Sequence, residues 1–264
     1  MQGKIIGQMN ALGFSAKEEA TLNALTLDVV KSSEIEGELL NYEQVRSSVA
    51  RRLGINSVGL VKSSRHIEGI VEMMMDATQR FNLPLTEKRL FGWHAALFPT
   101  GFSGPYKIEV ACYRTGEMQV VSDAMDKEKV HFEAIKPALV PAEMEKFLHW
   151  FNNDNSLDPV LKAAIAHFWF IIIHPFDDGN GRIGRAISDM LLARAEGSGE
   201  RFYSMSSQIL EERKQYYDVL QKVQHSSNDI TEWLKWFLHC LKFQLTRLDV
   251  VVKLLPSHQI IFSN

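Results

Sequence analysis

The sequence predicts an all-α protein, a helical bundle that carries one β-hairpin. Most of the chain repeats its apolar residues near the 3.6-residue period of a helix, as in residues 58–80. Alternation of the strand type is confined to residues 119–122 and 130–134. Capping residues and glycines stand between the periodic segments, where helices should begin and end. A bundle of helices with a single hairpin satisfies all three observations.

In the first part of the chain we expect helices over residues 21–40, 41–53, 58–80 and 86–98. The side chains of Asn41 and Thr86 can each cap a helix N-terminus. Gly54 can end a helix in the left-handed conformation. Gly37 should stop or bend the first helix, because glycine is a poor helix former.

Beyond the hairpin we expect helices over residues 141–153, 157–173, 183–196, 207–224 and 232–252. Within the second of these, residues 163–173 are apolar on nearly all sides, which is typical of a buried segment. Pro175 ends it, because proline lacks the amide proton and disfavours the helical conformation of the residue before it.

The polar loop after Pro175 has the parts of an anion site. Gly179 and Gly181 allow positive φ and close backbone approach, so that successive amides can converge on an anion. The helix that follows presents its free N–H groups and its positive dipole end. Arg182 and Arg185 share one face of the first turn and can bind phosphate oxygens. Asn180 can donate a side-chain hydrogen bond to a phosphate oxygen without adding charge.

Two further side chains of the loop point to chemistry on a polyphosphate. Asp178 would place a carboxylate beside the anion, and Mg²⁺ typically binds through one or two carboxylates plus substrate phosphates. His174 follows a rigid buried segment and is a base whose ordinary pKa lies near neutrality. The sequence therefore indicates a site where a metal, a phosphate chain and a base meet.

Residues 174–185 match the HPFx(D/E)GNGRxxR loop of the Fic family letter for letter, and the chain therefore resembles that family. The loop is neither a GxxxxGK[ST] phosphate loop nor a GxGxxG dinucleotide motif. The resemblance implies the Fic fold and transfer of AMP from ATP to a Ser, Thr or Tyr hydroxyl of a target protein. It also implies His174 as the catalytic base, Asp178 as the ligand of Mg²⁺ or Mn²⁺, and as nucleotide-binding residues Gly179, Asn180, Gly181, Arg182 and Arg185.

A second motif lies near the N-terminus. Ser32, Glu36 and Gly37 fit the inhibitory pattern (S/T)xxxE(G/N) of many Fic proteins. The resemblance implies that this segment is a helix packed against the active loop, and that Glu36 pairs with Arg185 and blocks the seat of the ATP γ-phosphate. A carboxylate in that place would take the donors that the phosphate needs and add like charge.

The resemblance also implies roles outside the two motifs. The hairpin corresponds to the flap, which aligns the target's chain beside the nucleotide by main-chain pairing. Tyr217 and Gln224 have the spacing of the residues that border the adenine pocket, although asparagine is commoner than glutamine at the second position. Arg114, just ahead of the flap, is either functional or a structural ion-pair partner, and the sequence leaves both readings open.

Three segments are expected along the chain. Residues 1–60 form an N-terminal helical segment with the inhibitory motif, residues 61–252 form the Fic core, and residues 253–264 form a short tail. Related Fic proteins often continue into a winged helix domain, and we expect none within this chain.

Composition restricts the class of protein. Charged residues make up 23% and hydrophobic residues 45%, as in ordinary globular proteins. The net charge of −3 gives no reason to expect a nucleic-acid or membrane partner. We find no signal-peptide pattern and no apolar run of membrane-spanning length, so we expect a cytoplasmic protein. The oligomeric state stays open.

Two alternatives to AMP transfer remain at this stage. The same site could remove AMP from a modified target, with the inhibitory glutamate orienting a water molecule. The chain could instead be a regulatory module that binds a nucleotide or a partner without turnover, although the intact His174 argues against a dead site.

Overall fold

The computed structural model describes residues 7, 14–55, 59, 61–122, 129–224 and 229–259. Its helices and strands in chain order are α2 (Phe14–Ile35), α3 (Tyr42–Leu53), α4 (Arg65–Gln79), α5 (Glu87–Leu97), β1 (Phe102–Ser103), β2 (Tyr106–Lys107), β3 (Gln119–Ser122), β4 (Lys129–Glu133), the 3₁₀ turn η1 (Pro137–Leu139), α6 (Val140–Asn153), α7 (Pro159–Ile173), α8 (Asn180–Glu196), α9 (Met205–Glu211), α10 (Arg213–Gln224) and α11 (Thr231–Gln259).

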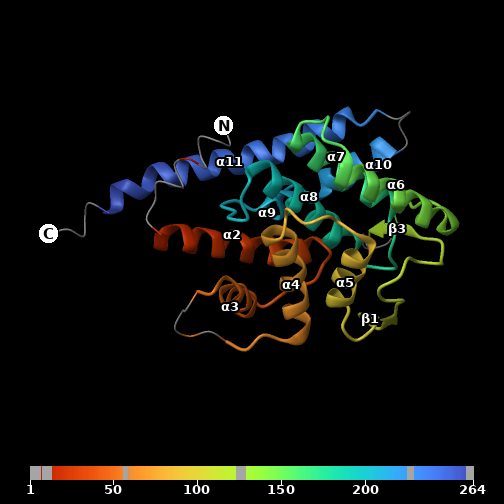
Figure 1. Ribbon diagram of the computed structural model, residues 1–264, viewed down its shortest axis with the longest axis horizontal. Coiled ribbons are helices and arrows are strands. Elements are labelled where there is room, and N and C mark those ends of the chain that lie inside the picture. Colours follow the sequence, from red (N-terminus) through yellow and green to blue (C-terminus); the bar gives the residue numbers. More distant parts are fainter. Residues whose placement is uncertain are drawn as a thin grey trace.

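Helices α7 and α8 form the centre of the bundle and pack closely against each other (Figure 1). Helix α2 lies along α9 and also contacts α3, α4 and α8, while α6 and the long α11 pack on α7. The side chains of α8 are buried nearly throughout the helix, including its first turns. A polar loop that opens α8 is therefore fixed by the core of the protein.

Local sequence explains several helix ends as expected. Asn41 accepts a hydrogen bond from the Gln44 amide at 3.0 Å, and Gly54 ends the same helix with a φ of 73°. Thr86 accepts from the Arg89 amide at 3.2 Å and begins α5. These three predicted caps are confirmed.

Other helix bounds differ from the expectation. The helix expected from residue 58 begins at Arg65, because Ser64 caps it by accepting from the Ile67 amide. The helix expected over residues 207–224 is two helices, α9 and α10, which meet at Glu212. The carboxylate of Glu212 accepts hydrogen bonds from Gln208 and Trp236, so tertiary contacts hold the break.

The start of α8 and the ends of α2 and α11 also differ. Helix α8 begins at Asn180, three residues before the expected start. Helix α2 ends at Ile35, and the chain turns at Gly37 with a φ of 84°. Helix α11 continues to Gln259, so that the tail expected from residue 253 begins as helix.

The expected hairpin is present as an antiparallel pair, β3 and β4, with Gln119 opposite Glu133. Residues 123–128 of its turn lie outside the described part of the chain. A second, shorter hairpin of β1 and β2 was not expected. It follows Gly101 and turns at Gly104, and both glycines have positive φ. Two-residue strands are too short to show alternation in the sequence.

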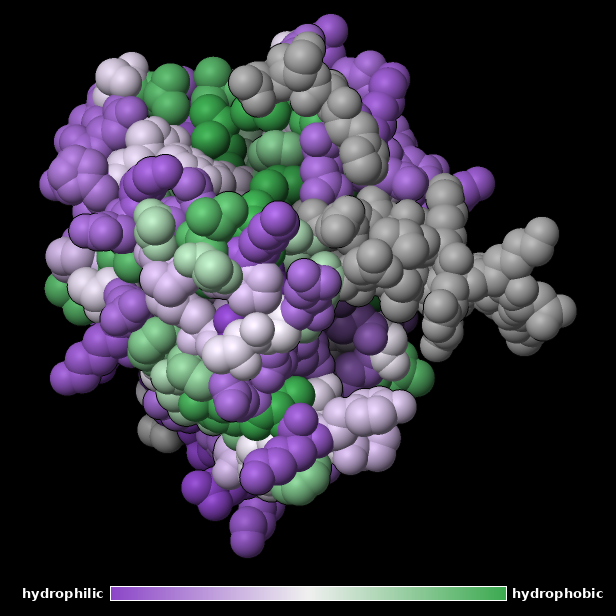
Figure 2. Space-filling model, turned by 90° about the vertical axis from the view of Figure 1, so that its right-hand side faces the viewer, coloured by the Kyte–Doolittle hydropathy of each residue, from purple (hydrophilic) through white to green (hydrophobic). Residues whose placement is uncertain are grey.

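In the described part of the chain, no helix combines the length and the apolar character that crossing a membrane requires. The face at the right-hand end of Figure 1 mixes hydrophilic side chains with separate hydrophobic patches (Figure 2).

Candidate active site

The loop between α7 and α8 is closed by its own side chains. Helix α7 ends at His174, which adopts the left-handed conformation with φ 49° and ψ 61°. Gly179, with a φ of 81°, occupies the N-cap position of α8. Asn180 Oδ1 accepts from the Phe176 amide at 2.9 Å, and Asn180 Nδ2 donates to the Phe176 carbonyl at 2.7 Å. The Asn180 side chain, which we expected on a phosphate, thus holds the loop together through its oxygen and one of its two N–H groups.

Phe176 anchors the loop in the core. Its ring stacks on His94 with centroids 4.3 Å apart. His94 Nδ1 accepts from the Ala111 amide at 3.1 Å, and burial lowers the pKa of this imidazole to about 4. The neutral His94 ring therefore packs against Phe176 and stabilises the loop.

Two arginines lie near the N-terminus of α8. The amides at the start of a helix have no acceptor in the preceding turn. Arg182 in the first turn and Arg185 in the second lie on the same face of α8 and are only 5% and 1% exposed. Among the described residues, Arg185 Nη1 and Arg182 Nε have no hydrogen bond partner. Buried donors of this kind fit an anionic ligand.

Arg185 binds the end of α2. Its Nε donates to Ser32 Oγ and its Nη2 to the Ser32 carbonyl, both at 2.8 Å, and Nη2 also donates to Glu36 Oε1 at 2.6 Å. The structure thus brings Ser32 and Glu36 onto the arginine that the sequence singled out. Gly37 follows with the positive φ that lets the chain turn away after Glu36.

The Glu36 carboxylate also lies on the loop itself. A methyl group built on Gly181 would come within 2.0 Å of Glu36 Oε1. Only glycine lets the carboxylate approach the backbone so closely. Glu36 therefore occupies the space above the first turn of α8.

A second acid contacts the other arginine. Glu38 Oε2 accepts from Arg182 Nη1 at 2.9 Å, and Glu38 Oε1 contacts His66 Nε2 on α4. Burial opposes ionisation of Glu38, but the His66 hydrogen bond and the Arg182 charge outweigh it and lower the pKa of this carboxyl. Sequence reasoning missed Glu38 and His66. The only signal was an acid two residues after Glu36.

His174 is held in its neutral form. Burial, opposed by a hydrogen bond between Nδ1 and the Ile171 carbonyl at 3.2 Å, lowers the pKa of His174 to about 4, and the Arg114 charge adds to the lowering. A proton on Nδ1 donates to Ile171 and leaves the ring lone pair on Nε2. At neutral pH the imidazole can therefore accept a proton.

Asp178 is oriented by two donors. Ser103 Oγ, from the short β1–β2 hairpin, donates to Oδ2, and the Gly179 amide donates to Oδ1. In the ranges that the structure describes, no three acidic, histidine or cysteine side chains cluster as a metal site. A single carboxylate fits Mg²⁺ when water and substrate phosphates supply the other oxygens. Ser103 is a further residue that the sequence did not indicate.

The two residues expected at the adenine lie on α10. The Tyr217 ring packs edge-on against Tyr216, with centroids 5.0 Å apart, and the Arg213 guanidinium lies 5.5 Å from its centre. Burial, followed by the charge of Glu36, raises the pKa of Tyr217 to about 12. Gln224 is the last residue of α10, about two helical turns beyond Tyr217 and on the same face.

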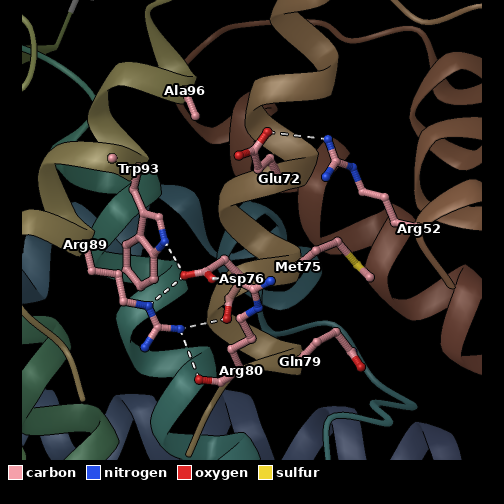
Figure 3. Close-up of a pocket in the computed structure, with 10 residues that line it drawn as sticks. Arg52, Glu72, Met75, Asp76, Gln79, Arg80, Arg89, Trp93 and Ala96 are labelled. Atoms are coloured by element: carbon pink, nitrogen blue, oxygen red, sulfur yellow. Dashed lines mark hydrogen bonds and ion pairs between the residues drawn. The ribbon is translucent and has the colours of Figure 1, made fainter. Parts of the chain in front are cut away.

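Another hollow, of about 500 Å³, lies between α3, α4 and α5 and contains none of these residues (Figure 3). Its charged side chains bind one another. Asp76 accepts from Arg89 Nε at 2.6 Å and from Trp93 Nε1 at 2.7 Å, while Arg52 pairs with Glu72 at 3.5 Å. These pairs hold α4 to its neighbours, and the hollow is not the candidate site.

Comparison with solved structures identifies the fold. A Fic family protein from Desulfovibrio desulfuricans superposes with a TM-score of 0.68 at 24% identity, covering 96% of this chain and 72% of that one. A Fic domain containing signaling protein from Bacteroides thetaiotaomicron gives a TM-score of 0.67 at 23% identity, covering 95% of this chain and 96% of that one. The expected fold, a mostly helical Fic fold with a small antiparallel hairpin, is confirmed.

Comparison with known sequences also finds a Fic protein. "Protein adenylyltransferase Fic" of Drosophila grimshawi is 27% identical over 238 residues, which are 89% of this chain and 44% of the relative. The chain therefore spans less than half the length of this curated relative. Residues 84–192 match the model described as Fic/DOC family, and residues 1–55 match a domain of unknown function, DUF4172. The chain thus pairs a Fic/DOC family domain with an N-terminal DUF4172 domain, and it is distantly similar to protein adenylyltransferases.

Proposed function

We propose that this protein is an adenylyltransferase that moves AMP from ATP to a Ser, Thr or Tyr hydroxyl of a target protein. One observation carries the proposal. The loop after α7 and the first two turns of α8 bring a neutral imidazole, an oriented carboxylate and two buried arginines to one helix N-terminus. Each group matches a need of nucleotidyl transfer, namely a base, a metal ligand and phosphate donors.

The nucleotide would lie over the first turn of α8. The amides of residues 179–181 would bind the α- and β-phosphates, because a helix N-terminus favours negative charge. Arg182 would bind the leaving pyrophosphate portion and Arg185 the γ-phosphate. The buried, unpartnered Arg182 Nε and Arg185 Nη1 support these roles. Tyr217 and Gln224 would border the adenine.

His174 would start the reaction. Its Nε2 takes the proton of the target hydroxyl while the hydroxyl oxygen forms a bond to the α-phosphorus. The bond from that phosphorus to the bridging oxygen of the β-phosphate breaks, and pyrophosphate leaves. The low pKa of His174 supports this role, because the ring is unprotonated before each turnover at neutral pH. The β3–β4 flap would hold the target's chain beside His174.

Asp178 would hold Mg²⁺ or Mn²⁺ together with the phosphates. A divalent cation at this place offsets the negative charge that develops on the phosphate oxygens. The two hydrogen bonds to Asp178 from Ser103 and Gly179 fix the carboxylate in place before any ligand arrives.

Glu36, with Ser32 and Gly37, would hold the enzyme inactive. The carboxylate lies above Gly181 and takes an Arg185 donor, so a γ-phosphate directed to the same arginine meets like charge and fewer donors. Displacement of Glu36 would then restore productive ATP binding.

The test uses ATP labelled at the α-phosphate and, separately, at the γ-phosphate. We expect the Glu36→Gly variant to label itself from α-labelled ATP well above wild type, and to gain no label from γ-labelled ATP. Addition of His174→Ala to that variant should abolish the label. A Glu36→Gly protein that folds, binds ATP and transfers no AMP would contradict the proposal.

One observation also favours the reverse reaction as a second candidate. Glu36 already lies at the loop, where its carboxylate can accept a proton from a water molecule that attacks an AMP ester. Wild-type protein incubated with the AMP-modified product of the Glu36→Gly variant separates the two functions. Release of AMP by wild type but not by Glu36→Gly would assign removal of AMP to this chain.

A further inference from the structure

Arg114 joins the end of α7 to the base of the flap. The side chain is 2% exposed. Its Nε donates to the His174 carbonyl at 2.7 Å and its Nη1 to the Gly116 carbonyl at 2.7 Å, while Nη2 donates to the Ile135 carbonyl at 2.5 Å. Gly116 precedes strand β3 and Ile135 follows strand β4. One guanidinium thus holds both ends of the flap and the backbone of the proposed base.

The main chain of Arg114 strengthens this junction. Its amide donates to the Pro175 carbonyl at 2.8 Å, directly after His174. The flap ends are also tied to each other, because the Ala134 amide donates to the Met118 carbonyl at 3.2 Å. Backbone hydrogen bonds therefore tie the segment before the flap to the loop after α7.

The acceptors of the Arg114 side chain in the described part of the chain are backbone carbonyls. Burial lowers the pKa of Arg114, yet a guanidinium stays protonated in proteins. Its three nitrogens form a rigid planar fork that reaches carbonyls on three segments, and the compact ammonium of lysine does not reproduce that spacing. All of its donor nitrogens are used at this junction, so Arg114 is not a phosphate ligand.

His174 needs such support. It is one of two non-glycine residues with positive φ in the described ranges. This conformation is strained for a histidine and persists only when surrounding contacts hold it. The bond from Arg114 to the His174 carbonyl fixes the peptide that follows the imidazole, and the positive charge of Arg114 favours the neutral ring.

We propose that Arg114 is a positioning residue for AMP transfer, which sets the distance between the His174 base and the flap that presents the target hydroxyl. The inference rests on the proposed function and deepens it. The sequence left Arg114 open between a functional residue and an ion-pair partner, and its side-chain hydrogen bonds within the described residues, which go to backbone carbonyls, support the former.

The test uses the Glu36→Gly protein as parent and compares Arg114→Lys and Arg114→Met. Arg194→Lys and Arg194→Met are matched controls, because Arg194 also donates to two backbone carbonyls, those of Phe81 and Leu83, away from the loop. The measurements are self-labelling from α-labelled ATP, ATP affinity, and release of free AMP by attack of water on the same phosphorus.

We expect Arg114→Lys to slow self-labelling by roughly ten- to hundredfold, because a misplacement of about 1 Å costs that much. ATP affinity should stay within about twofold of the parent, since the phosphate donors are intact. Release of AMP to water should fall less than self-labelling, because water does not depend on the flap. A residue with only a structural role would lower both rates together.

The pH profile gives a separate readout. Loss of the positive neighbour in Arg114→Met should move the acid limb of self-labelling to higher pH, whereas Arg114→Lys keeps a charge and should leave it in place.

The Arg194 variants should match the parent throughout. Arg114 variants that also match the parent, or that lose both rates equally, would overturn the inference. No labelling by the Glu36→Gly parent itself would overturn the proposed function instead. If Arg114→Met fails to fold, Arg114→Lys decides the matter by its ratio of labelling to AMP release.

Discussion

Glu36 Oε1 lies 2.6 Å from Arg185 Nη2, and the same oxygen lies over Gly181, so one carboxylate contacts both the arginine and the loop that a triphosphate would need. Under the proposed function, binding of ATP and seating of Glu36 would compete for one place. We expect Glu36→Gly to raise ATP affinity about tenfold, equivalent to ~1.4 kcal/mol. Titration calorimetry of wild type and variant with ATP checks the value, and equal affinities would show that Glu36 does not obstruct the nucleotide.

Glu38 forms an ion pair with Arg182, with an N–O distance of 2.9 Å, as Glu36 does with Arg185. Substitution Glu38→Gln in the Glu36→Gly background should therefore raise ATP affinity by a further few-fold, because a charge-assisted bond to the arginine becomes a neutral one. Glu34→Gln is the matched control, since Glu34 pairs with Lys31 and not with either arginine. A similar gain in both variants would assign the effect to net charge alone.

Asp178 should make nucleotide binding depend on a divalent cation. In the Glu36→Gly protein, Mg²⁺ or Mn²⁺ should strengthen ATP binding relative to a solution with a chelator, and Asp178→Asn should remove that gain. Asp177→Asn is the control, because the neighbouring Asp177 carboxylate accepts from the Glu109 amide instead. Calorimetry with and without metal measures the difference. If Asp178→Asn keeps the full gain, the metal lies elsewhere.

Asn180 should matter for stability more than its polar side chain suggests. Substitution Asn180→Ala leaves the buried Phe176 amide without its acceptor, which costs about 1–3 kcal/mol of folding free energy. Chemical denaturation measures the loss. Asn153→Ala on the exposed side of α6 should change stability little, because its side chain bonds to His149 of the same helix at the surface.

We predict that the buried Asp28 makes the folding stability of the protein depend on pH. This buried carboxyl on α2 accepts from Ser204 Oγ at 2.6 Å, and burial, followed by the charge of Asp189, raises its pKa to about 7. Between its unfolded value and pH 7 the folded state binds more protons than the unfolded state. Stability from this group is therefore present at low pH and is lost as pH rises through 7.

Asp28→Asn tests that sign. Asparagine keeps an acceptor for Ser204 but has no charge to bury, so the variant should gain stability over wild type at pH 8 by about 1–3 kcal/mol and little at pH 5. Thermal unfolding at both pH values measures the difference. A gain of the same size at pH 5 and pH 8 would contradict the prediction.

Local patterns predicted the helices and the loop because their causes are local. Asn41, Gly54 and Thr86 act within one turn of their own positions. The motif at Ser32 and Glu36 predicted a contact with Arg185 about 150 residues away, which only the resemblance to a family could supply. The Glu38–Arg182 pair spans the same distance with no motif to indicate it.

The side-chain contacts that the sequence did not predict are those that depend on the folded structure. Asn180 lies in a phosphate motif, yet its side chain is used for loop closure. Glu212 interrupts a strong helical pattern, and its two carboxylate oxygens accept from Gln208 and from Trp236. Nothing near Ser103 in the sequence indicates that it reaches Asp178. Such hydrogen bonds depend on which side chains the folded core brings together.

The helix that leads to Glu36 is itself part of the protein interior. Leu22, Leu25 and Val29 of α2, and Ile35 at its last turn, are all buried. Removing this whole helix would expose a large apolar area and would unfold much of the molecule. Under the proposed inhibition, a signal that displaces Glu36 would therefore act on the short turn of residues 36–38, where Gly37 has a φ of 84°, and would leave helix α2 in place.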